Sequence, residues 1–546
     1  MKAHLLVVLG LALGLILLVF LAAAGPASLA QDPCQRYVSI EGSDTTDCSN
    51  EGKPCETVQY AINQSSTGDR ICVSSVLLKP DPTVYTETIT IDRSVILDGA
   101  WESQCFVHIP CVFQPVDPCD PDRVVLNAAG LGRVLTIEPR TNPTIDCFTI
   151  TGGDADGLGG DPGSGNAGGG IFSDRASPII VNNVISGNFG CDFCSTTNGY
   201  GGGIYLLEAP STAFIGKNLI AYNVADNGSR GMGGGIMLRD SDASVEDNEI
   251  HNNRAALSAG YGGGIAVVGG EPTLAGNEIV DNVAGQSREG QGGGIYVQSD
   301  KTVSIEGNII YDNQAINSAG DPALISQGGG IYYSGAPTVQ AVIWDNDIGQ
   351  NIASPVSHRG YGGGLYATGL VTPSLIAANN VFSNTAGELD SGKGGGIFLD
   401  GSEATLQGNE IISNTATVSG PQGNGGGVYV EGGSVTIRGN AVVGNAGGRG
   451  VASSIGYGGG MVISDTVALV QNNLITGNRA TNSPDFAIGG GIYAFTSTVR
   501  IVGNIITENS LTTGLVGYGG GLYLHVSLST VDGNSITDHK AGEGLL

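Results

Sequence analysis

The sequence predicts an all-β protein: a right-handed parallel β-helix solenoid with three short strands per coil and a short N-terminal capping helix. Three observations predict it. Glycine makes up 91 of 546 residues and 40% of the chain is hydrophobic, which is too apolar for disorder and too glycine-rich for an ordinary two-layer domain. A Gly-Gly-Gly-aliphatic tetrad recurs twelve times, and a pair of asparagines follows it at nearly constant spacing. Such repetition indicates a solenoid.

The N-terminal residues 1–30 have the pattern of a secretory signal peptide. A short basic start precedes an apolar run from Leu5 to Ala24, and Ser28 and Ala30 hold the small-residue positions before a cleavage point. The apolar run is also long enough to cross a bilayer. Membrane association is expected only if this segment is retained as an anchor. In both cases we expect the remaining chain to be secreted or on a bacterial cell surface.

All the cysteines lie in the first part of the chain. An even number behind an export signal predicts disulfides, whose pairing the sequence does not give. Cys191 and Cys194 form a CxxC motif, for which half of a zinc site is the alternative, but no second CxxC or nearby histidine completes such a site. The ten residues are Cys34, Cys48, Cys55, Cys72, Cys105, Cys111, Cys119, Cys147, Cys191 and Cys194.

Residues 31–150 are predicted to form the Cys-rich N-terminal cap and the first coils. Residues 37–39 and 70–73 have the composition of strands, and residues 57–63 that of a short amphipathic helix. Val58, Ala61 and Ile62 give this helix one apolar side. A helix laid across the open end of a solenoid shields the core from water.

Residues 151–546 are predicted to form a repeat β-helix of about twelve coils. Successive tetrads are 29 to 36 residues apart, which is enough for three short strands and three turns. Coils stacked at about 4.8 Å bury a shared core that no single unit has. The tetrads end at Ile171, Ile204, Ile236, Ile265, Ile295, Ile331, Leu365, Ile397, Val428, Met461, Ile492 and Leu522.

Two asparagines, five residues apart, occupy the same place in eleven of the twelve units. Parallel stacking places equivalent asparagines above one another, so that each side-chain amide bonds to the next in a ladder. The first members are Asn183, Asn218, Asn248, Asn277, Asn308, Asn346, Asn379, Asn409, Asn440, Asn473 and Asn504, and in the twelfth unit Asn534 is followed by His539.

The residue after each tetrad is aromatic in nine of the twelve units. It follows a residue predicted to point into the core, so it is predicted to point outward. Two interpretations remain open: a stacking ladder that stiffens the sheet, or a stripe on which sugar rings stack. The residues are Phe172, Tyr205, Tyr296, Tyr332, Tyr366, Phe398, Tyr429, Tyr493 and Tyr523.

One glycine-rich acidic loop is a candidate metal site. Asp154, Asp156 and Asp161 alternate with glycines in residues 152–161, and hard oxygen donors at such spacing suit Ca²⁺. The alternative is a plain flexible loop. We expect no other cofactor, because the glycine runs lack the Lys-Ser/Thr of a phosphate-binding loop.

Two sets of motifs resemble a known family. The opening stretch, with Tyr37-Val38-Ser39, Gly42-Ser43-Asp44 and Thr57-Val58-Gln59-Tyr60-Ala61, looks like that of bacterial right-handed parallel β-helix repeat proteins with a pectin-lyase-like fold. The tetrads, with units such as Ile185-Ser186-Gly187-Asn188, are similar to the repeats of chlamydial polymorphic outer membrane proteins. The resemblance implies the fold, which lyases, hydrolases and adhesins share.

Composition and motifs limit the classes of function that this chain can have. A net charge of -28, from 23 basic and 51 acidic residues, excludes nucleic acid as a partner because too few cations are present to replace its counterions. No constellation of catalytic residues is predicted. We expect an exported, non-catalytic surface or extracellular β-helix with a role in adhesion or glycan binding, and a polysaccharide as its partner. The alternatives are a carbohydrate-active enzyme, either a polysaccharide lyase or a glycoside hydrolase, and a purely structural envelope component.

Overall fold

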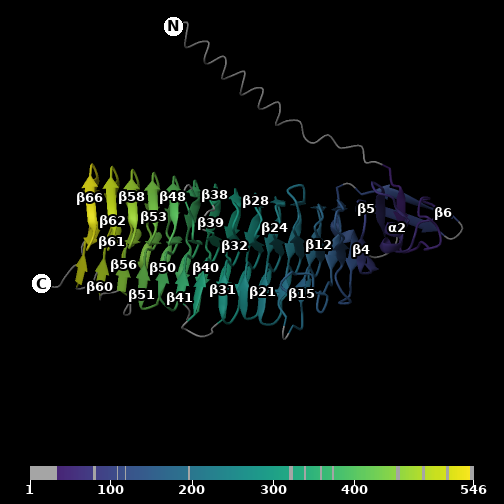
Figure 1. The fold of residues 1–546 in the computed structure, drawn as a ribbon, viewed down its shortest axis with the longest axis horizontal. Coiled ribbons are helices and arrows are strands. Elements are labelled where there is room, and N and C mark those ends of the chain that lie inside the picture. Colours follow the sequence, from purple (N-terminus) through teal and green to yellow (C-terminus); the bar gives the residue numbers. More distant parts are fainter. Residues whose placement is uncertain are drawn as a thin grey trace, which may run out of the picture.

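The chain winds into one elongated right-handed parallel β-solenoid of about fifteen turns, seen side-on in Figure 1. The computed structural model describes residues 33–77, 82–106, 109–116, 118–194, 197–318, 324–336, 340–356, 359–371, 374–450, 455–482, 486–511 and 516–540. The predicted signal peptide, residues 1–30, lies outside them.

Five sheets run along the solenoid where three were expected. Within the described residues, sheet A has 17 strands, from β1 (Arg36–Val38) to β66 (Leu528–Asp532), and sheet B has 15, from β3 (Thr83–Thr86) to β67 (Ser535–Thr537). Sheet C has 14 strands, from β4 (Ile89–Ile91) to β65 (Leu522–His525). Sheet D has 9, from β15 (Phe189–Cys191) to β55 (Ala446–Gly448), and sheet E has 12, from β11 (Asn166–Ala167) to β64 (Val516–Tyr518).

One coil illustrates the path of the chain. It comprises β22 (Ile236–Arg239) in sheet C, β23 (Ser244–Glu246) in sheet A, β24 (Glu249–His251) in sheet B, β25 (Arg254–Ala256) in sheet D and β26 (Ala259–Tyr261) in sheet E. The segment after the second asparagine therefore contains two further strands. Sequence patterning missed them because this segment varies in length between units and is rich in glycine and other small residues, so it lacks the apolar run that predicts a strand.

The core is one continuous cluster of mostly aliphatic side chains, stacked in columns from sheets A, B and C. The residue that ends each tetrad points inward as predicted, and Ile171, Ile204 and Ile236 stack in register in sheet C with no exposed surface. The same cluster reaches from Val38 to Ile506. Burying this apolar surface at about 25 cal/mol per Å² is the main force that holds the coils together.

The glycine triplet forms the corner between sheets E and C. The first glycine has a positive φ in every tetrad, as at Gly394 with φ +63°. At the second and third there is no room for a side chain: a Cβ on Gly395 would lie 2.3 Å from the Thr415 carbonyl carbon, and one on Gly396 2.8 Å from the Gly427 carbonyl oxygen. The triplet thus meets a steric requirement of the corner.

The predicted asparagine ladders are confirmed. The Asn183 side-chain amide donates to the Asn218 side-chain oxygen on the next coil at 3.1 Å, and to the Ile145 carbonyl oxygen on the previous coil at 2.9 Å. Asn218 then continues to Asn248 at 3.0 Å. In the last coil His539 takes the asparagine position, where its Nδ1 accepts the Asn509 N–H at 3.2 Å.

The predicted cap is present as helix α2 (Val58–Gln64), at the opposite end from the C-terminus in Figure 1. Val58, Ala61 and Ile62 are buried in the main core. Thr57 caps the helix by accepting the Tyr60 N–H at 3.3 Å. Sheets A, B and C continue from this region into the repeats without a break, so the cap and the repeats share one solenoid.

The cysteines form five disulfides: Cys34–Cys72, Cys48–Cys55, Cys105–Cys111, Cys119–Cys147 and Cys191–Cys194. Cys105 and Cys111 join a hairpin of β5 (Ile96–Phe106) and β6 (Ile109–Pro115) that extends from sheet A. The CxxC motif is therefore a disulfide. Five disulfides fit an oxidising compartment. Among the described residues, none of the helices has the length and hydropathy needed to span a bilayer.

Candidate functional site

The aromatic column of sheet C lies outside the core but is mostly buried. Its rings form a second apolar cluster together with side chains from sheet E. Tyr205 has no exposed surface and Tyr332 is only 9% exposed, whereas Tyr493 and Tyr523 are partly exposed. Phe172, Tyr296, Tyr366, Phe398 and Tyr429 are all buried as well.

The rings cover one another along the solenoid. The Tyr296 and Tyr332 centroids are 5.1 Å apart with a 7° angle between the rings, and those of Tyr332 and Tyr366 are 5.3 Å apart with an angle of 10°. Stacking of this kind supports the stiffening-ladder interpretation for the middle of the column. A sugar has no free ring face to stack on there.

Sheet E supplies a second aromatic column, which was not predicted from the sequence. The glycine corner turns the outward side chains of sheets E and C toward each other, so Tyr261 contacts Tyr296 at 5.3 Å between centroids and Tyr457 contacts Tyr493 at 5.5 Å. A signal was available, because tyrosine directly precedes the glycine triplet in five units. These are Tyr200, Tyr261, Tyr361, Tyr457 and Tyr518.

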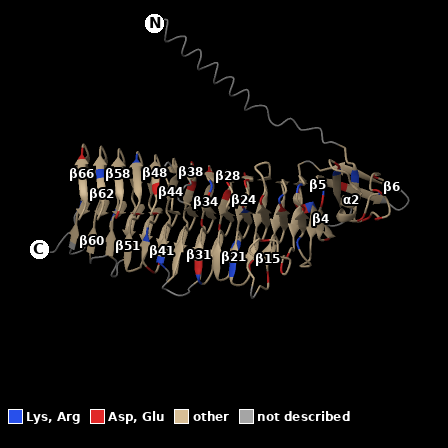
Figure 2. Cartoon of the chain, in the orientation of Figure 1, with Lys and Arg blue, Asp and Glu red and all other residues tan. Residues whose placement is uncertain are grey.

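We call the strip where the outward side chains of sheets E and C meet the E/C groove, and Lys393 on this strip forms an ion pair with Glu431. The Lys393 ammonium lies 2.6 Å from a Glu431 carboxylate oxygen and 4.8 Å from the Tyr429 ring centroid. Burial lowers the pKa of Lys393, but Tyr429 and Glu431 raise it by more, so its pKa lies above the ordinary value. In Figure 2 strands β21 (Arg230–Met232) and β41 (Arg359–Tyr361), which carry basic residues, lie on either side of β31 (Glu289–Gln291), which carries an acidic one.

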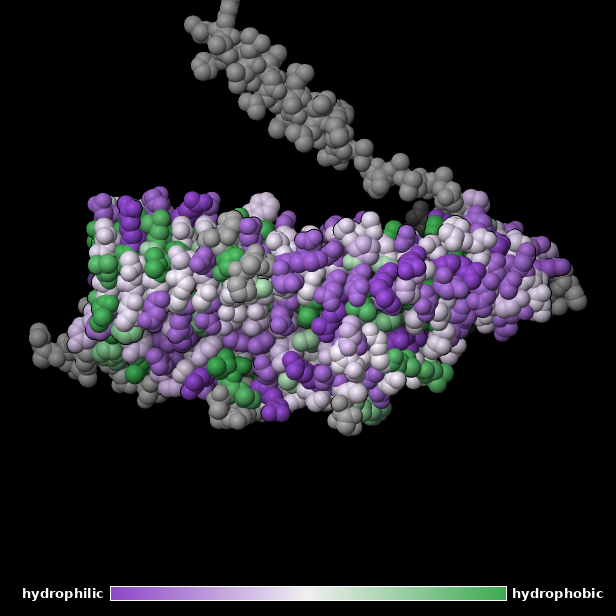
Figure 3. Space-filling view, viewed as in Figure 1, coloured by the Kyte–Doolittle hydropathy of each residue, from purple (hydrophilic) through white to green (hydrophobic). Residues whose placement is uncertain are grey.

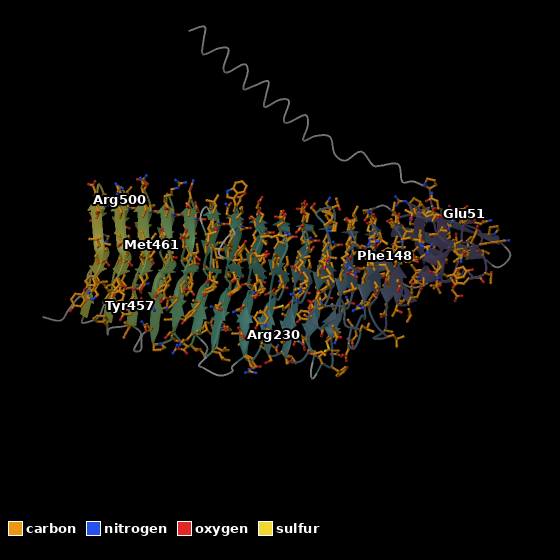
Figure 4. All side chains as sticks on the ribbon, in the orientation of Figure 1. Glu51, Phe148, Arg230, Tyr457, Met461 and Arg500 are labelled. Atoms are coloured by element: carbon orange, nitrogen blue, oxygen red, sulfur yellow. A yellow bond between two sulfur atoms is a disulfide. The ribbon has the colours of Figure 1, made fainter. Side chains whose placement is uncertain are left out.

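The groove contains a cavity at one of the three coils where the aromatic column is interrupted; at the other two, Met237 and Ala266 are fully buried. In the strand after Tyr429 the column position holds Val462, and the ring resumes at Tyr493 on the following coil. A cavity of about 250 Å³ fills this place. We call it the Val462 notch, and Figure 4 places Tyr457 on the sheet E edge that borders it, on the same edge as Arg230 and opposite Arg500. Its lining is Gln422, Asn424, Tyr429, Tyr457, Val462, Ser464, Tyr493 and Phe495.

The notch combines apolar faces with neutral polar groups. Tyr457, Tyr493 and Phe495 are partly exposed, so ring surface is accessible here. Asn424, Gln422 and Ser464 offer amide and hydroxyl groups that both donate and accept hydrogen bonds. None of the eight lining residues carries a charge. Figure 3 shows further apolar side chains gathered over the C-terminal coils.

The three aspartates of the predicted calcium loop have different partners. Asp161 is buried and its carboxylate accepts from the Tyr205 hydroxyl at 2.7 Å and from Arg239 at 2.9 Å. Asp156 is exposed and contacts Cys191 and Cys194.

Asp154 is half-buried, which raises the pKa of its carboxyl. In the described part of the chain, one group of metal-ligating side chains has all its ligand atoms within 4.8 Å of one another, namely Asp156, Cys191 and Cys194. Asp161 is not among them, and calcium binding by this loop stays a prediction.

The chain matches a known protein family over most of its length. The model of the right-handed beta helix region matches residues 135–369, 288–467 and 396–545. No curated protein matches the sequence.

Solved structures with similar folds include three proteins. One is the A-module of mannuronan C-5 epimerase AlgE6 of Azotobacter vinelandii, with 10% identity and a TM-score of 0.32 over 87% of this chain and 94% of that chain. The second is the Dettilon tailspike protein, with 13% identity and a TM-score of 0.25 over 70% of this chain and 62% of that chain. The third is the GH136 lacto-N-biosidase of Eubacterium ramulus, with 11% identity and a TM-score of 0.23 over 93% of this chain and 67% of that chain.

The similarity to chlamydial polymorphic outer membrane proteins stays an expectation from the repeats. The family model spans most of the chain, and its matches follow the repeated coils that carry the glycine corners and asparagine ladders. The chain belongs to the right-handed β-helix family.

Proposed function

We propose that this protein is an exported, non-catalytic β-helix that binds a neutral polysaccharide in the E/C groove, with the Val462 notch holding one sugar ring. The observation that carries the proposal is the notch itself: partly exposed rings of Tyr457 and Tyr493 beside the amides of Gln422 and Asn424. Ring faces pack against the C–H groups of a sugar, while amides exchange hydrogen bonds with its hydroxyls.

The charge of the chain favours a neutral ligand over an acidic one. The net charge of -28 repels polyanions such as pectate or alginate. The notch itself offers no charged side chain to pair with a carboxylate. Lys393, whose ammonium lies 4.8 Å from the ring of Tyr429 in the notch lining, is engaged by Glu431.

A binding screen tests the proposal. Affinity electrophoresis in gels containing mannan, galactan, β-glucan, alginate or pectate is expected to show retardation by a neutral polysaccharide. Tyr493→Ala is expected to weaken it by at least about tenfold, a loss of about 1.4 kcal/mol. Trp344→Ala is the matched control, because Trp344 is 47% exposed on sheet A, outside the groove. Absence of retardation by every polysaccharide contradicts the proposal.

A carbohydrate-active enzyme is the second candidate. Among the close polar pairs of the groove, the Tyr366 hydroxyl donates to Asp400 at 2.6 Å. Burial and Asp400 raise the pKa of Tyr366, which keeps this hydroxyl protonated near neutral pH, so that it is a weak acid and is not available as a base. Release of reducing ends or unsaturated sugars that Asp400→Asn abolishes favours the enzyme over the binding protein.

A further inference from the structure

The acidic loop and the CxxC disulfide lie against each other. The Asp156 Oδ1 atom is 3.4 Å from the Cys191 Sγ atom and 3.7 Å from the Cys194 Sγ atom. Both cysteines are buried, while Asp156 is exposed. In the disulfide neither sulfur has a proton to donate, so neither of these contacts is a hydrogen bond in the oxidised form.

These separations match the edges of a tetrahedral metal site. With Zn–S of about 2.3 Å and Zn–O of about 2.0 Å, a tetrahedral angle places the sulfur and oxygen ligands about 3.5 Å apart. The two observed separations, 3.4 and 3.7 Å, lie on either side of this value. In the oxidised form the sulfur–sulfur bond prevents the two cysteines from binding a metal ion as thiolates.

The surroundings of Cys194 suit a thiolate. The Asn166 side-chain amide and the Thr197 hydroxyl each lie 3.1 Å from the Cys194 Sγ atom and donate toward it. A disulfide sulfur is a weak acceptor, whereas hydrogen-bond donors stabilise a thiolate. The Asn166 amide also lies 3.3 Å from the Asp156 Oδ1 atom, so one buried side chain orients two candidate ligands, as outer partners do in metal sites.

We propose that Cys191, Cys194 and Asp156 form a redox-gated site for a thiophilic divalent cation such as Zn²⁺. A dithiol or phosphine reductant supplies two electrons and breaks the Cys191–Cys194 bond, leaving two thiols; the dithiol becomes a disulfide, or the phosphine its oxide with oxygen from water. The metal then displaces two protons and bonds to both thiolates and the carboxylate. Because Asp156 is exposed, solvent gives the metal access and supplies the fourth ligand.

The site does not depend on the proposed glycan binding. It also revises the expected calcium loop, because it uses one of its three aspartates together with sulfur ligands in place of oxygen donors alone. Asp161 is held by Arg239 and Tyr205 and takes no part. The nearby carboxylates of Asp154 and Asp192 add negative charge that attracts a cation.

Metal titration of the reduced full-length chain tests the proposal. The protein is treated with a phosphine, desalted anaerobically, and titrated with Co²⁺ and then Zn²⁺ while thiolate-to-cobalt charge-transfer absorption is recorded. The wild type is expected to bind one equivalent more than Cys191→Ser/Cys194→Ser treated in the same way. Asp156→Asn is expected to weaken Zn²⁺ binding by at least about tenfold, and Asp300→Asn, exposed and far along the chain, is expected to have no effect.

Alkylation of the wild type gives a readout that does not rely on the double variant folding. Peptide mapping after reduction is expected to show Cys191 and Cys194 labelled without Zn²⁺ and protected with it. The proposal is overturned if these cysteines resist reduction, if Zn²⁺ leaves their labelling unchanged, or if Asp156→Asn binds Zn²⁺ as tightly as the wild type.

Discussion

The side-chain amide of Asn414 donates a hydrogen bond to the side-chain oxygen of Asn445 on the next coil, 3.0 Å away. The Asn414 side-chain oxygen in turn accepts from the backbone N–H and the side-chain amide of Asn384, each at 3.0 Å. Each asparagine is therefore both donor and acceptor between coils, and all three are buried.

Replacing one ladder asparagine is expected to destabilise the solenoid. Asn414→Ala leaves the Asn384 donors and the Val381 carbonyl oxygen without this partner, and buried polar groups without partners cost about 1–3 kcal/mol each. We expect the free energy of unfolding to fall by about 2–4 kcal/mol in urea melts. Asn380→Ala, on the outer face of sheet B, is expected to change it by less than about 0.5 kcal/mol. Equal effects of the two substitutions contradict the ladder's role.

The glycine corner gives a second prediction. In Gly394→Ala the new Cβ meets the Ile397 carbonyl oxygen at 2.5 Å and the φ stays at +63°. Gly401→Ala is the matched control, because its φ is +56° but no atom lies within 4 Å of the Cβ. We expect the control to cost about 1–2 kcal/mol from backbone strain alone, and Gly394→Ala to cost clearly more in thermal or urea unfolding. Similar losses of unfolding free energy in Gly394→Ala and Gly401→Ala would show that the corner can accommodate a Cβ atom.

Filling the Val462 notch is expected to abolish glycan retention. Val462→Tyr continues the ladder between Tyr429 and Tyr493 and occupies the cavity of about 250 Å³. The electrophoretic shift caused by a bound neutral polysaccharide should disappear while the thermal midpoint stays the same or rises. Val467→Tyr, at a position 56% exposed on sheet A, controls for an added tyrosine. Retention that persists in Val462→Tyr places the binding elsewhere on the surface.

Stability is expected to fall in alkali because of buried tyrosines. Burial, together with Glu289, raises the pKa of Tyr261 from 10.0 to about 12. Since the folded-state pKa is raised, the contribution to stability is complete below pH 10 and is lost as the pH rises toward 12, where the unfolded tyrosine ionises first. Urea midpoints at pH 9 and pH 11 should differ less in Tyr261→Phe than in the wild type. If the urea midpoints at pH 9 and pH 11 differ by the same amount in both proteins, Tyr261 does not contribute to the loss of stability in alkali.

The fold was predictable because its information is periodic. Units of 29 to 36 residues stack equivalent side chains of successive coils on one another. The tetrads therefore predicted the inward column that begins at Ile171, and the repeated asparagines predicted the hydrogen-bonded ladders. The strands of sheets D and E were missed, since their segment varies in length and is rich in small residues, without the apolar runs found in sheets A and B. The candidate site was predictable only in part: the aromatic column was found, but not its burial by sheet E.

The sequence by itself determined the solenoid, its core and its ladders, because each depends on residues at the same position of successive coils, and it determined the capping helix through the apolar side formed by Val58, Ala61 and Ile62. The tertiary structure decided which cysteines pair, that Asp161 lies with Arg239, 78 residues away, and that Asp156 lies with Cys191 and Cys194. It also decided that the aromatic column is buried from Phe172 to Tyr429 and partly exposed at Tyr493, beside the Val462 notch, and at Tyr523. These contacts join residues at non-equivalent positions of the repeat. Whether such residues meet depends on how the backbone turns at the corners of the solenoid, which the repeat pattern does not give.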